Sequence, residues 1–557
     1  MIKRRNLLAG GAVLAASSAL YAWANNRFTS QATDAANRPV LQFPPLIDTV
    51  DTGKFLVTAQ SGTTSFFPVH RAETIGFNQA YLGPVVRISN GALRPSVENG
   101  LSWPVSAHWH GLVVPGKHDG GPHLPVKPGE VWAPDMEIGQ QPCTAFFHTH
   151  IHGRTARDVY AGLAGVLHIA DGLDGERGLP DTYGVDDLTL LLQDRRFSRD
   201  GQLVYANSMM DIMHGMTGDT IVVNGQVGSV AAVPKSVVRL RLINGSNARI
   251  YSLFSSDDRP IHLIATDGGY LPAPVQLETL RLGPGERAEI LVDFSDGHGM
   301  SLMSEGDPNT GMGGMMGRAR GLLDEITGGR RFEVLPFLVD ERLPAKVTRI
   351  PDVLGGDQPN LTAARVSKLR NFSLDMGMGG GMMGSGGMGR GMMGGMAING
   401  QPFDMSVIND RVRLGDTEKW VISTSMLAHP FHVHGVSFQV ISENGREPRP
   451  ESLGWKDTVV VDSQTELLVQ FTQPASEETP FMYHCHILEH EDAGMMGLDR
   501  TSVLSRHRRS GLQPHFMRYL ARAAMTRITR MAISSIQTPP SPINPPPIVL
   551  FIISGPP

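Results

Sequence analysis

Short runs of β-branched residues recur through most of this chain, and Gly, Pro, Asn or Asp separates each run from the next. They include "PVVRISNG", "SVVRLRLING" and "RAEILVDF" between residues 41 and 345, and "KDTVVVD" and "ELLVQFT" after residue 396. No stretch shows the 3.6-residue periodicity of a long helix. Many short strands at regular spacing predict an all-β protein built from sandwiches or barrels.

The length of the chain predicts several such domains, because 557 residues exceed one ordinary domain. The segments "VNGQ" (Val223–Gln226) and "INGQ" (Ile398–Gln401) indicate equivalent turns in two related units. We therefore expect three β-domains, at residues 41–172, 185–345 and 365–500.

Two segments rich in methionine and glycine interrupt the strand pattern. Residues 376–396 contain eight Met and eleven Gly, and "GMGGMMG" at 311–317 is a shorter version. Such glycine density disfavours a stable core or helix, so both segments predict flexible loops. The tail at 501–557 contains seven Arg and no acidic residue and ends in a proline-rich stretch, which predicts a disordered extension or an aberrant, out-of-frame stretch.

The N-terminus predicts export. Arg4 and Arg5 precede an apolar run from Leu7 to about Ala24, and "AWA" at 22–24 matches a small-residue cleavage site. This pattern predicts a twin-arginine signal peptide at 1–24, recognition by the twin-arginine (Tat) export machinery and a periplasmic mature protein. An uncleaved membrane anchor is the alternative. No other segment has the roughly 18 apolar residues of a membrane-spanning helix.

Charge and cysteine content exclude some classes of protein. The formal net charge of −5 is small for this length and gives no indication of a nucleic-acid partner. Two cysteines, Cys143 and Cys485, are too few for a disulfide scaffold. We expect Cys143 to be a small buried apolar residue.

Cys485 lies in the stretch "HCHILEHEDAGMM", which runs from His484 to Met496. Successive side chains of a β-strand point to opposite faces, so His484 and His486 face one side and Cys485 the other. One strand can then hold two metal centres back to back. A Cys thiolate, two His and a weak axial Met form a blue-copper electron-transfer site, and Cys485, His490 and Met495 supply three of these four ligands.

Three further histidine clusters accompany this stretch. "HWHG" contains His108 and His110, "HTHIHG" contains His148 and His150, and "HPFHVHG" contains His429, His432 and His434. The i, i+2 spacing recurs in three pairs here and again in His484 and His486. Four pairs offer eight imidazoles, which suits three copper ions that share one cluster.

These four motifs resemble those of the multicopper oxidases, and residues 41 to about 500 resemble their three consecutive cupredoxin-like Greek-key β-barrel or sandwich domains. The export signal, the Met-rich segments and "HCHILEHEDAGMM" are most similar to the periplasmic copper-efflux (cuprous) oxidases, a laccase-like group.

The resemblance implies four copper ions as cofactors, and it implies that the residues at the matching positions are their ligands. It assigns the type 1 copper to Cys485, His429, His490 and Met495. It assigns the type 2 copper to His108 and His432, and the type 3 pair to His110, His148, His150, His434, His484 and His486.

Three carboxylates match positions with other roles in that family. Asp457 in "GWKDTVVV" resembles a carboxylate that orients a type 1 His ring. Asp119 and Glu491 match the relay positions that deliver protons to the cluster, a task for which burial can tune a carboxyl group. Cys485, Asp119 and Glu491 are thus the expected catalytic residues.

The expected function is one-electron oxidation of Cu(I), and of phenols or Fe(II), coupled to reduction of dioxygen to water, in copper tolerance. Dioxygen and Cu(I) or small reducing substrates are the expected partners, and the chain is expected to be a monomer. Methionine thioethers suit Cu(I), which favours the cuprous oxidase. However, Ser425 and Leu427 replace the Asp and Met that help to bind substrate copper in that group, which leaves Asp375, Met376 and Met378 as candidates.

Three alternatives remain open from the sequence. The first is a general laccase or bilirubin oxidase that acts on phenols. The second is a copper-free structural protein, like the periplasmic cell-division relative with the same fold, for which lost ligands would be the signature. The third is a non-enzymatic periplasmic copper store.

Overall fold

A computed structural model describes residues 35–205, 208–306, 331–362, 364–376 and 395–502. The chain divides into a compact unit, Met1–Val503, and a second unit, Leu504–Pro557, and all described residues belong to the first. The predicted signal peptide, the segment at 311–317, most of 376–396 and the tail beyond Ser502 lie outside the described residues.

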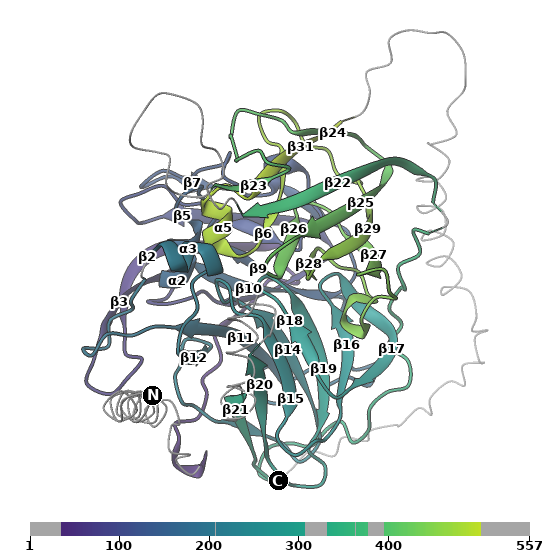
Figure 1. The fold of residues 1–557 in the computed structure, drawn as a ribbon. Coiled ribbons are helices and arrows are strands. Elements are labelled where there is room, and N and C mark those ends of the chain that lie inside the picture. Colours follow the sequence, from purple (N-terminus) through teal and green to yellow (C-terminus); the bar gives the residue numbers. More distant parts are fainter. Residues whose placement is uncertain (1–34, 206–207, 307–330, 363, 377–394, 503–557) are drawn as a thin grey trace, which may run out of the picture. The chain divides into compact units, whose positions relative to one another are not determined.

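Six β-sheets in three consecutive pairs form the framework of the described part of the chain (Figure 1), and the all-β prediction is confirmed. The domain limits predicted from the sequence stay predictions, although the change from one pair of sheets to the next falls close to them.

The first pair spans residues 46–170. One sheet has the spatial order β1 (Leu46–Asp48), β4 (Val85–Ser89), β10 (Ala164–Ala170), β9 (Cys143–His148) and β6 (His108–His110). The other has β3 (Ala72–Phe77), β2 (Lys54–Thr64), β5 (Gly91–Asn99) and β7 (Val131–Trp132), with β8 (Met136–Ile138) paired to β5. Side chains of β2 alternate between outward and buried positions from Lys54 to Ala59, so that Phe55 and Val57 join a core with Trp109.

The second pair spans residues 187–339. One sheet has the order β12 (Thr220–Val223), β11 (Asp187–Arg195), β14 (Val237–Asn244), β19 (Arg287–Asp293), β16 (Ile261–Thr266) and β17 (Gly269–Leu277). The other has β13 (Ala231–Val233), β21 (Arg331–Val339), β20 (Met300–Gly306), β15 (Tyr251–Ser255) and β18 (Leu280–Leu282). Because β14 lies between two strands in the middle of its sheet, all its residues are buried, and Arg239 and Arg241 form buried ion pairs there.

The third pair spans residues 366–502. One sheet has the order β23 (Met396–Ile398), β22 (Val366–Met376), β25 (Thr417–Thr424), β29 (Gln464–Gln470) and β27 (Phe438–Glu443). The other has β24 (Asp410–Arg413), β31 (Met496–Ser502), β30 (Phe481–Cys485), β26 (His429–Val433) and β28 (Thr458–Val461). The core of this pair includes Trp420, Phe431, Cys485 and Met495.

The two Asn-Gly turns have the same conformation. Asn224 and Gly225 have φ values of 50° and 77°, and Asn399 and Gly400 have values of 54° and 69°. Each turn is closed by a bridge between its first and last residue. Positive φ at both central residues is the type I′ geometry that Asn-Gly favours in hairpins.

In the part of the chain that the structure describes, helices are few and short. They are α2 (Thr155–Ala161), α3 (Met209–His214) and α5 (Leu488–Asp492), with 3₁₀ turns η1 (Ala35–Asn37), η2 (Gly116–His118) and η4 (Pro450–Ser452). The carboxylate of Asp492 accepts hydrogen bonds from the backbone N–H groups of Thr155 and Ala156, which joins α5 to the start of α2. Among the described residues, none of the helices could span a membrane.

Candidate metal centre

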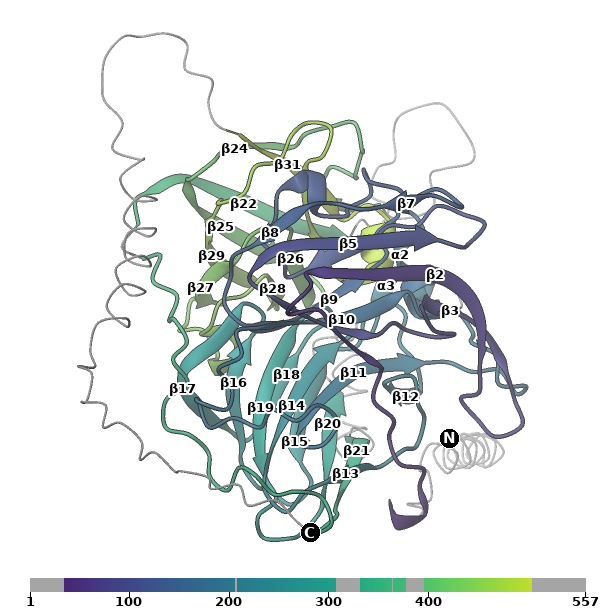
Figure 2. The ribbon, with the colours of Figure 1, turned by 180° about the vertical axis from the view of Figure 1, so that it is seen from behind.

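Strand register brings distant histidines together. In the antiparallel pair β6–β9, His108 lies opposite His148, and in the pair β26–β30, His432 lies opposite His484. Strands β9, β26 and β28 lie close together in both views (Figure 1 and Figure 2), and β6 lies beside them in Figure 1. The first and third pairs of sheets therefore supply one shared site.

The eight histidines of the four i, i+2 pairs form what we call the histidine cluster. Its members are His108, His110, His148, His150, His432, His434, His484 and His486, and each is at most 3% exposed. Two ring pairs across the domains are stacked, His108 on His434 and His110 on His432, each with ring centroids 3.7 Å apart. The structure brings these eight residues together, and their assignment as copper ligands stays a prediction.

Hydrogen bonds fix the tautomers of most of these rings. The Nδ1–H groups of His108, His148 and His432 donate to the backbone carbonyls of Asp119, Thr149 and Asp457, at 3.1, 2.9 and 2.9 Å. Because a carbonyl only accepts, Nε2 of each ring must carry the lone pair, and none of the three Nε2 atoms has a partner.

Two further rings, those of His434 and His484, point bare nitrogens at each other. Nδ1–H of His434 donates to the Asp119 carboxylate at 2.8 Å, and Nδ1–H of His484 donates to the Cys485 carbonyl at 3.1 Å. The two Nε2 lone pairs then face each other across 3.2 Å, and Nε2 of His150 lies 3.4 Å from that of His484. Such an arrangement is repulsive unless a cation lies between the nitrogens.

The rings also have the charge state of a metal site. Burial lowers the pKa values of His110, His148, His150, His484 and His486 well below the usual value, and neighbouring imidazoles add to this effect. Neutral imidazoles are copper ligands, whereas eight buried, uncharged bases with unmatched lone pairs would be costly without a metal. The residues present fit copper.

Cys485, His429, His490 and Met495 form a second group, the thiolate cluster. Nδ1 of His429 and Nδ1 of His490 lie 3.3 and 3.6 Å from Sγ of Cys485 and 3.2 Å from each other. All four residues are 0% exposed. Nε2–H of His490 donates to the Met213 carbonyl of α3 at 3.4 Å, which leaves Nδ1 bare beside the sulfur. Burial raises the pKa of the Cys485 thiol, so a metal that binds there displaces a proton.

The two clusters lie on opposite sides of β30. The ring of His484 faces His150 and His434, whereas Sγ of the next residue, Cys485, faces His429 and His490. The ring of His486 packs against His110 and His148 in the histidine cluster. The backbone from His484 to His486 therefore joins the clusters covalently, as strand alternation predicts.

Asp119 and Glu491 both contact the histidine cluster, but their pKa values shift in opposite directions. Burial alone would raise the pKa of Asp119, but His434 and His108 hold it well below its usual value, so this carboxylate is ionised. Burial raises the pKa of Glu491 well above its usual value, and Asp492 adds to the rise. The Glu491 carboxyl group lies 3.4 Å from Nδ1 of His150 and 3.3 Å from Nδ1 of His484.

Asp457 is in a different place from the one predicted. Its Oδ1 accepts from Nε2–H of His110 at 3.0 Å, so it orients a ring of the histidine cluster and not one of the thiolate cluster. The reason is strand register, because β28 pairs Thr458 with His432 and only Val461 with His429. The expectation that Asp457 orients a type 1 histidine is wrong.

The candidates for a substrate-copper site are not assembled in the described residues. The Asp375 carboxylate, on β22, accepts hydrogen bonds from Ser373 Oγ at 2.8 Å and from the Gly400 N–H at 2.7 Å, which ties it to the turn that follows β23. Met376 packs against the core of the third pair of sheets. Met378 lies outside the described residues.

Arg287 is a site residue that the sequence motifs did not reveal. Its guanidinium forms two hydrogen bonds with the Asp457 carboxylate, at 2.7 and 2.5 Å. It lies on β19, in the ordinary strand sequence "RAEILVD", where no motif marks it. Only the fold places it beside His110.

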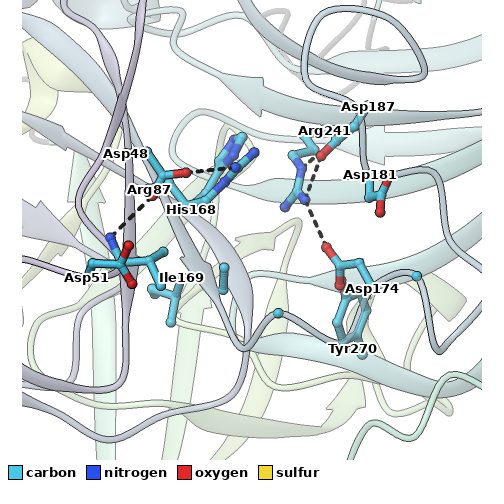
Figure 3. Close-up of a pocket in the computed structure, with 14 residues that line it drawn as sticks. Asp48, Asp51, Arg87, His168, Ile169, Asp174, Asp181, Asp187, Arg241 and Tyr270 are labelled. Atoms are coloured by element: carbon cyan, nitrogen blue, oxygen red, sulfur yellow. Dashed lines mark hydrogen bonds and ion pairs between the residues drawn. The ribbon is translucent and has the colours of Figure 1, made fainter. Parts of the chain in front are cut away.

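A separate pocket lies along β4, β10 and β11, away from both clusters (Figure 3). It holds about 390 Å³ and its lining includes Asp48, Arg87, His168, Asp187 and Arg241. Most of its charges are paired with one another, for example Arg241 with Asp187 at 2.7 Å. None of the predicted site residues lies in it.

Three profiles of the multicopper oxidase family match residues 58–173, 186–305 and 381–502. The chain belongs to the multicopper oxidase family. It is 41% identical to the solved structure of a laccase-like multi-copper oxidase, CueO, from Ochrobactrum sp., with a TM-score of 0.74 over 83% of this chain and 100% of that chain. The predicted fold of three cupredoxin-like domains is confirmed.

Curated relatives carry a different name, Cell division protein FtsP. The Xenorhabdus nematophila protein is 37% identical over 461 residues, which are 82% of this chain and 91% of the relative. The Escherichia coli K12 protein is 36% identical over 468 residues, 84% of this chain and 93% of the relative.

These relatives overturn the function expected from the sequence. A cuprous oxidase that serves copper tolerance, with a general laccase as its alternative, is the wrong prediction, because the curated relatives are named for cell division. Copper ligands indicate which metal a site can hold, and they carry no information about the cellular process that uses it.

Proposed function

We propose that this chain serves in cell division, like the FtsP proteins it is similar to, and that it does so as a copper-binding oxidoreductase with dioxygen as electron acceptor. The observation that carries the copper part is the set of bare, buried nitrogens. In particular, the Nε2 atoms of His434 and His484 face each other at 3.2 Å. The cell-division part is supported by the names of the curated relatives.

Four copper ions are proposed, one in the thiolate cluster and three in the histidine cluster. Bound there, copper would supply one-electron transfer and a binding place for dioxygen. His108 and His432 are the proposed ligands of one ion in the histidine cluster, and the six other rings hold the remaining two.

The chain's own residues suit this chemistry. Sγ of Cys485 and the ring of His484 are joined by two neighbouring residues of one strand, a short covalent path between the clusters. Glu491, whose pKa is raised, lies beside His150 and His484 and would give a proton at the cluster, whereas the carboxylate of Asp119 would keep the His434 and His108 rings oriented. Both roles are proposals for general-acid and positioning work.

Export to the periplasm by the twin-arginine route is part of the proposal. It is supported by Arg4 and Arg5 before the apolar run and by "AWA" at 22–24. A folded, metal-loaded protein is a suitable cargo for that route.

The test has two parts. Exported protein is purified and loaded with copper, and its copper content and its oxygen consumption with ascorbate are measured. In parallel, E. coli that lacks FtsP is supplied with this chain, or with its Cys485→Ser or His484→Ala variant, under conditions where FtsP is needed for division. Support for the whole proposal requires copper uptake, oxygen consumption and division that depends on both residues. If the variants support division fully, the role is structural and copper is dispensable for it.

A further inference from the structure

All predicted copper ligands lie before residue 151 or after residue 428, yet the middle pair of sheets reaches the histidine cluster through Arg287. The side chain of Arg287 is 0% exposed. Every one of its five N–H groups has an acceptor. Nε donates to Thr144 O (3.2 Å), Nη1 to Gly285 O (2.9 Å) and Asp457 Oδ1 (2.7 Å), and Nη2 to Asp267 O (3.2 Å) and Asp457 Oδ2 (2.5 Å).

These acceptors come from all three pairs of sheets. Thr144 lies on β9, the strand that ends at His148, whereas Gly285 and Asp267 belong to the middle pair. Asp457 directly precedes β28 of the third pair. One guanidinium therefore fixes the relative position of the segments that carry the histidines.

Asp457 transmits this fixed position to two cluster rings. Its Oδ1 accepts from Nε2–H of His110 at 3.0 Å, and its backbone carbonyl accepts from Nδ1–H of His432 at 2.9 Å. The hydroxyl of Thr458 lies 3.1 and 3.0 Å from the same two nitrogens. Nδ1 of His110 and Nε2 of His432 are thereby left bare, and neither has a partner.

His110 is the ring that depends most on this arrangement. The other cluster rings with a fixed tautomer donate Nδ1–H, whereas His110 donates Nε2–H and offers Nδ1. A carboxylate that is itself held by a bidentate Arg can fix which nitrogen of His110 carries the proton. Gly111, the residue after His110, leaves room for the guanidinium. Its φ is +96°, and a Cβ at this position would lie 2.5 Å from Nη2 of Arg287.

We propose that Arg287 is a positioning residue for the histidine cluster. Arg287 acts through Asp457 and holds His110 with its Nδ1 toward the metal. Stability alone gives a weaker explanation, because a buried ion pair often contributes little net folding free energy. The proposal rests on copper binding at this cluster, as proposed above.

Arg287→Lys tests the role, because lysine keeps the charge but loses the two-pronged geometry. Arg241→Lys is the matched control. Arg241 is also buried and grips Asp187 at 2.7 and 2.9 Å, but it lines the pocket of Figure 3 and is hydrogen-bonded to no cluster histidine. Asp457→Asn, which preserves side-chain volume, is the second test variant if Arg287→Lys does not fold.

The first readout is copper binding by each cluster. Arg287→Lys and Asp457→Asn should weaken binding at the histidine cluster by about 10–100-fold and keep the blue absorption of the thiolate cluster. Arg241→Lys should change neither. The second readout uses metal-free protein with ¹⁵N-labelled histidine, in which the His110 signal is assigned with His110→Gln. Wild type should carry the proton on Nε2, and both test variants should show a mixture of tautomers.

The two readouts separate the two proposals. If wild type takes up no copper but the tautomer of His110 depends on Arg287, the copper function fails and the positioning role stands. If the test variants and Arg241→Lys show the same His110 tautomer and the same copper uptake, Arg287 is only a structural residue and the positioning role is refuted.

Discussion

Nδ1 of His429 lies 3.3 Å from Sγ of Cys485, although the two residues are 56 positions apart in the chain. The antiparallel pair β26–β30 produces this contact, because Phe431 lies opposite Cys485 and His429 begins the same strand. A thiol and two imidazoles meet there in a buried site, and this set of ligands suits a soft metal.

Cys485→Ser should remove the blue absorption of copper-loaded protein and one bound copper ion. A hydroxyl cannot replace a soft thiolate, and the absorption arises from the bond between thiolate and copper. Absorption spectra of both proteins after copper loading check this, with Cys143→Ser as the control. A blue Cys485→Ser protein would show that another residue holds that copper.

His484→Ala should keep the blue absorption and abolish oxygen consumption. The ring of His484 faces His150 and His434, on the opposite side of β30 from the sulfur of its neighbour Cys485. Copper content should fall at the histidine cluster alone. A variant that loses its colour and keeps the copper of the histidine cluster would contradict the back-to-back arrangement.

Strand alternation in "HCH" was sufficient to predict that His484 and Cys485 face opposite sides of β30, because that property is local. The all-β fold was equally predictable from short runs and Asn-Gly turns. The contact of Asp457 with His110 was not predictable. Which histidine lies beside Asp457 depends on the register of β28 against β26, and a sequence motif does not reveal strand register.

Arg287 was beyond sequence reasoning for a similar reason. It contacts Asp457 across 170 positions, from a strand with no distinctive motif. The cellular role also could not be read from the residues, because the same copper ligands serve any electron donor. Only similarity to the FtsP proteins indicates cell division.

Asp499→Asn should stabilise the protein at alkaline pH. Burial raises the pKa of Asp499 to about 7 from 3.8. The folded state therefore favours the protonated carboxyl group, whose contribution to the free energy of unfolding is full below pH 3.8 and is lost as pH rises through 7. Charging this buried group costs up to about 4 kcal/mol at pH 8. Urea unfolding at pH 4 and pH 8 should show the gain only at pH 8, and none for the exposed Asp352→Asn. An equal gain at both values would exclude the ionisation as its cause.

Removal of residues 504–557 should leave folding and copper uptake unchanged. The compact unit ends at Val503, and β31, the last described strand, ends at Ser502. We expect a change in the free energy of unfolding below about 0.5 kcal/mol. Thermal unfolding and copper content of the truncated protein check this. Loss of soluble protein would show that the tail takes part in the fold.

Copper content per chain is the most direct measurement of the central claim. Protein exported from cells grown with copper is dialysed against buffer without copper, and metal and protein are quantified in the same sample. Four copper ions per chain are expected for wild type, three for Cys485→Ser and about one for His484→Ala if the histidine cluster empties as a unit. Wild-type protein that binds no copper would contradict the claim, because the facing Nε2 atoms of His434 and His484 would then not be copper ligands.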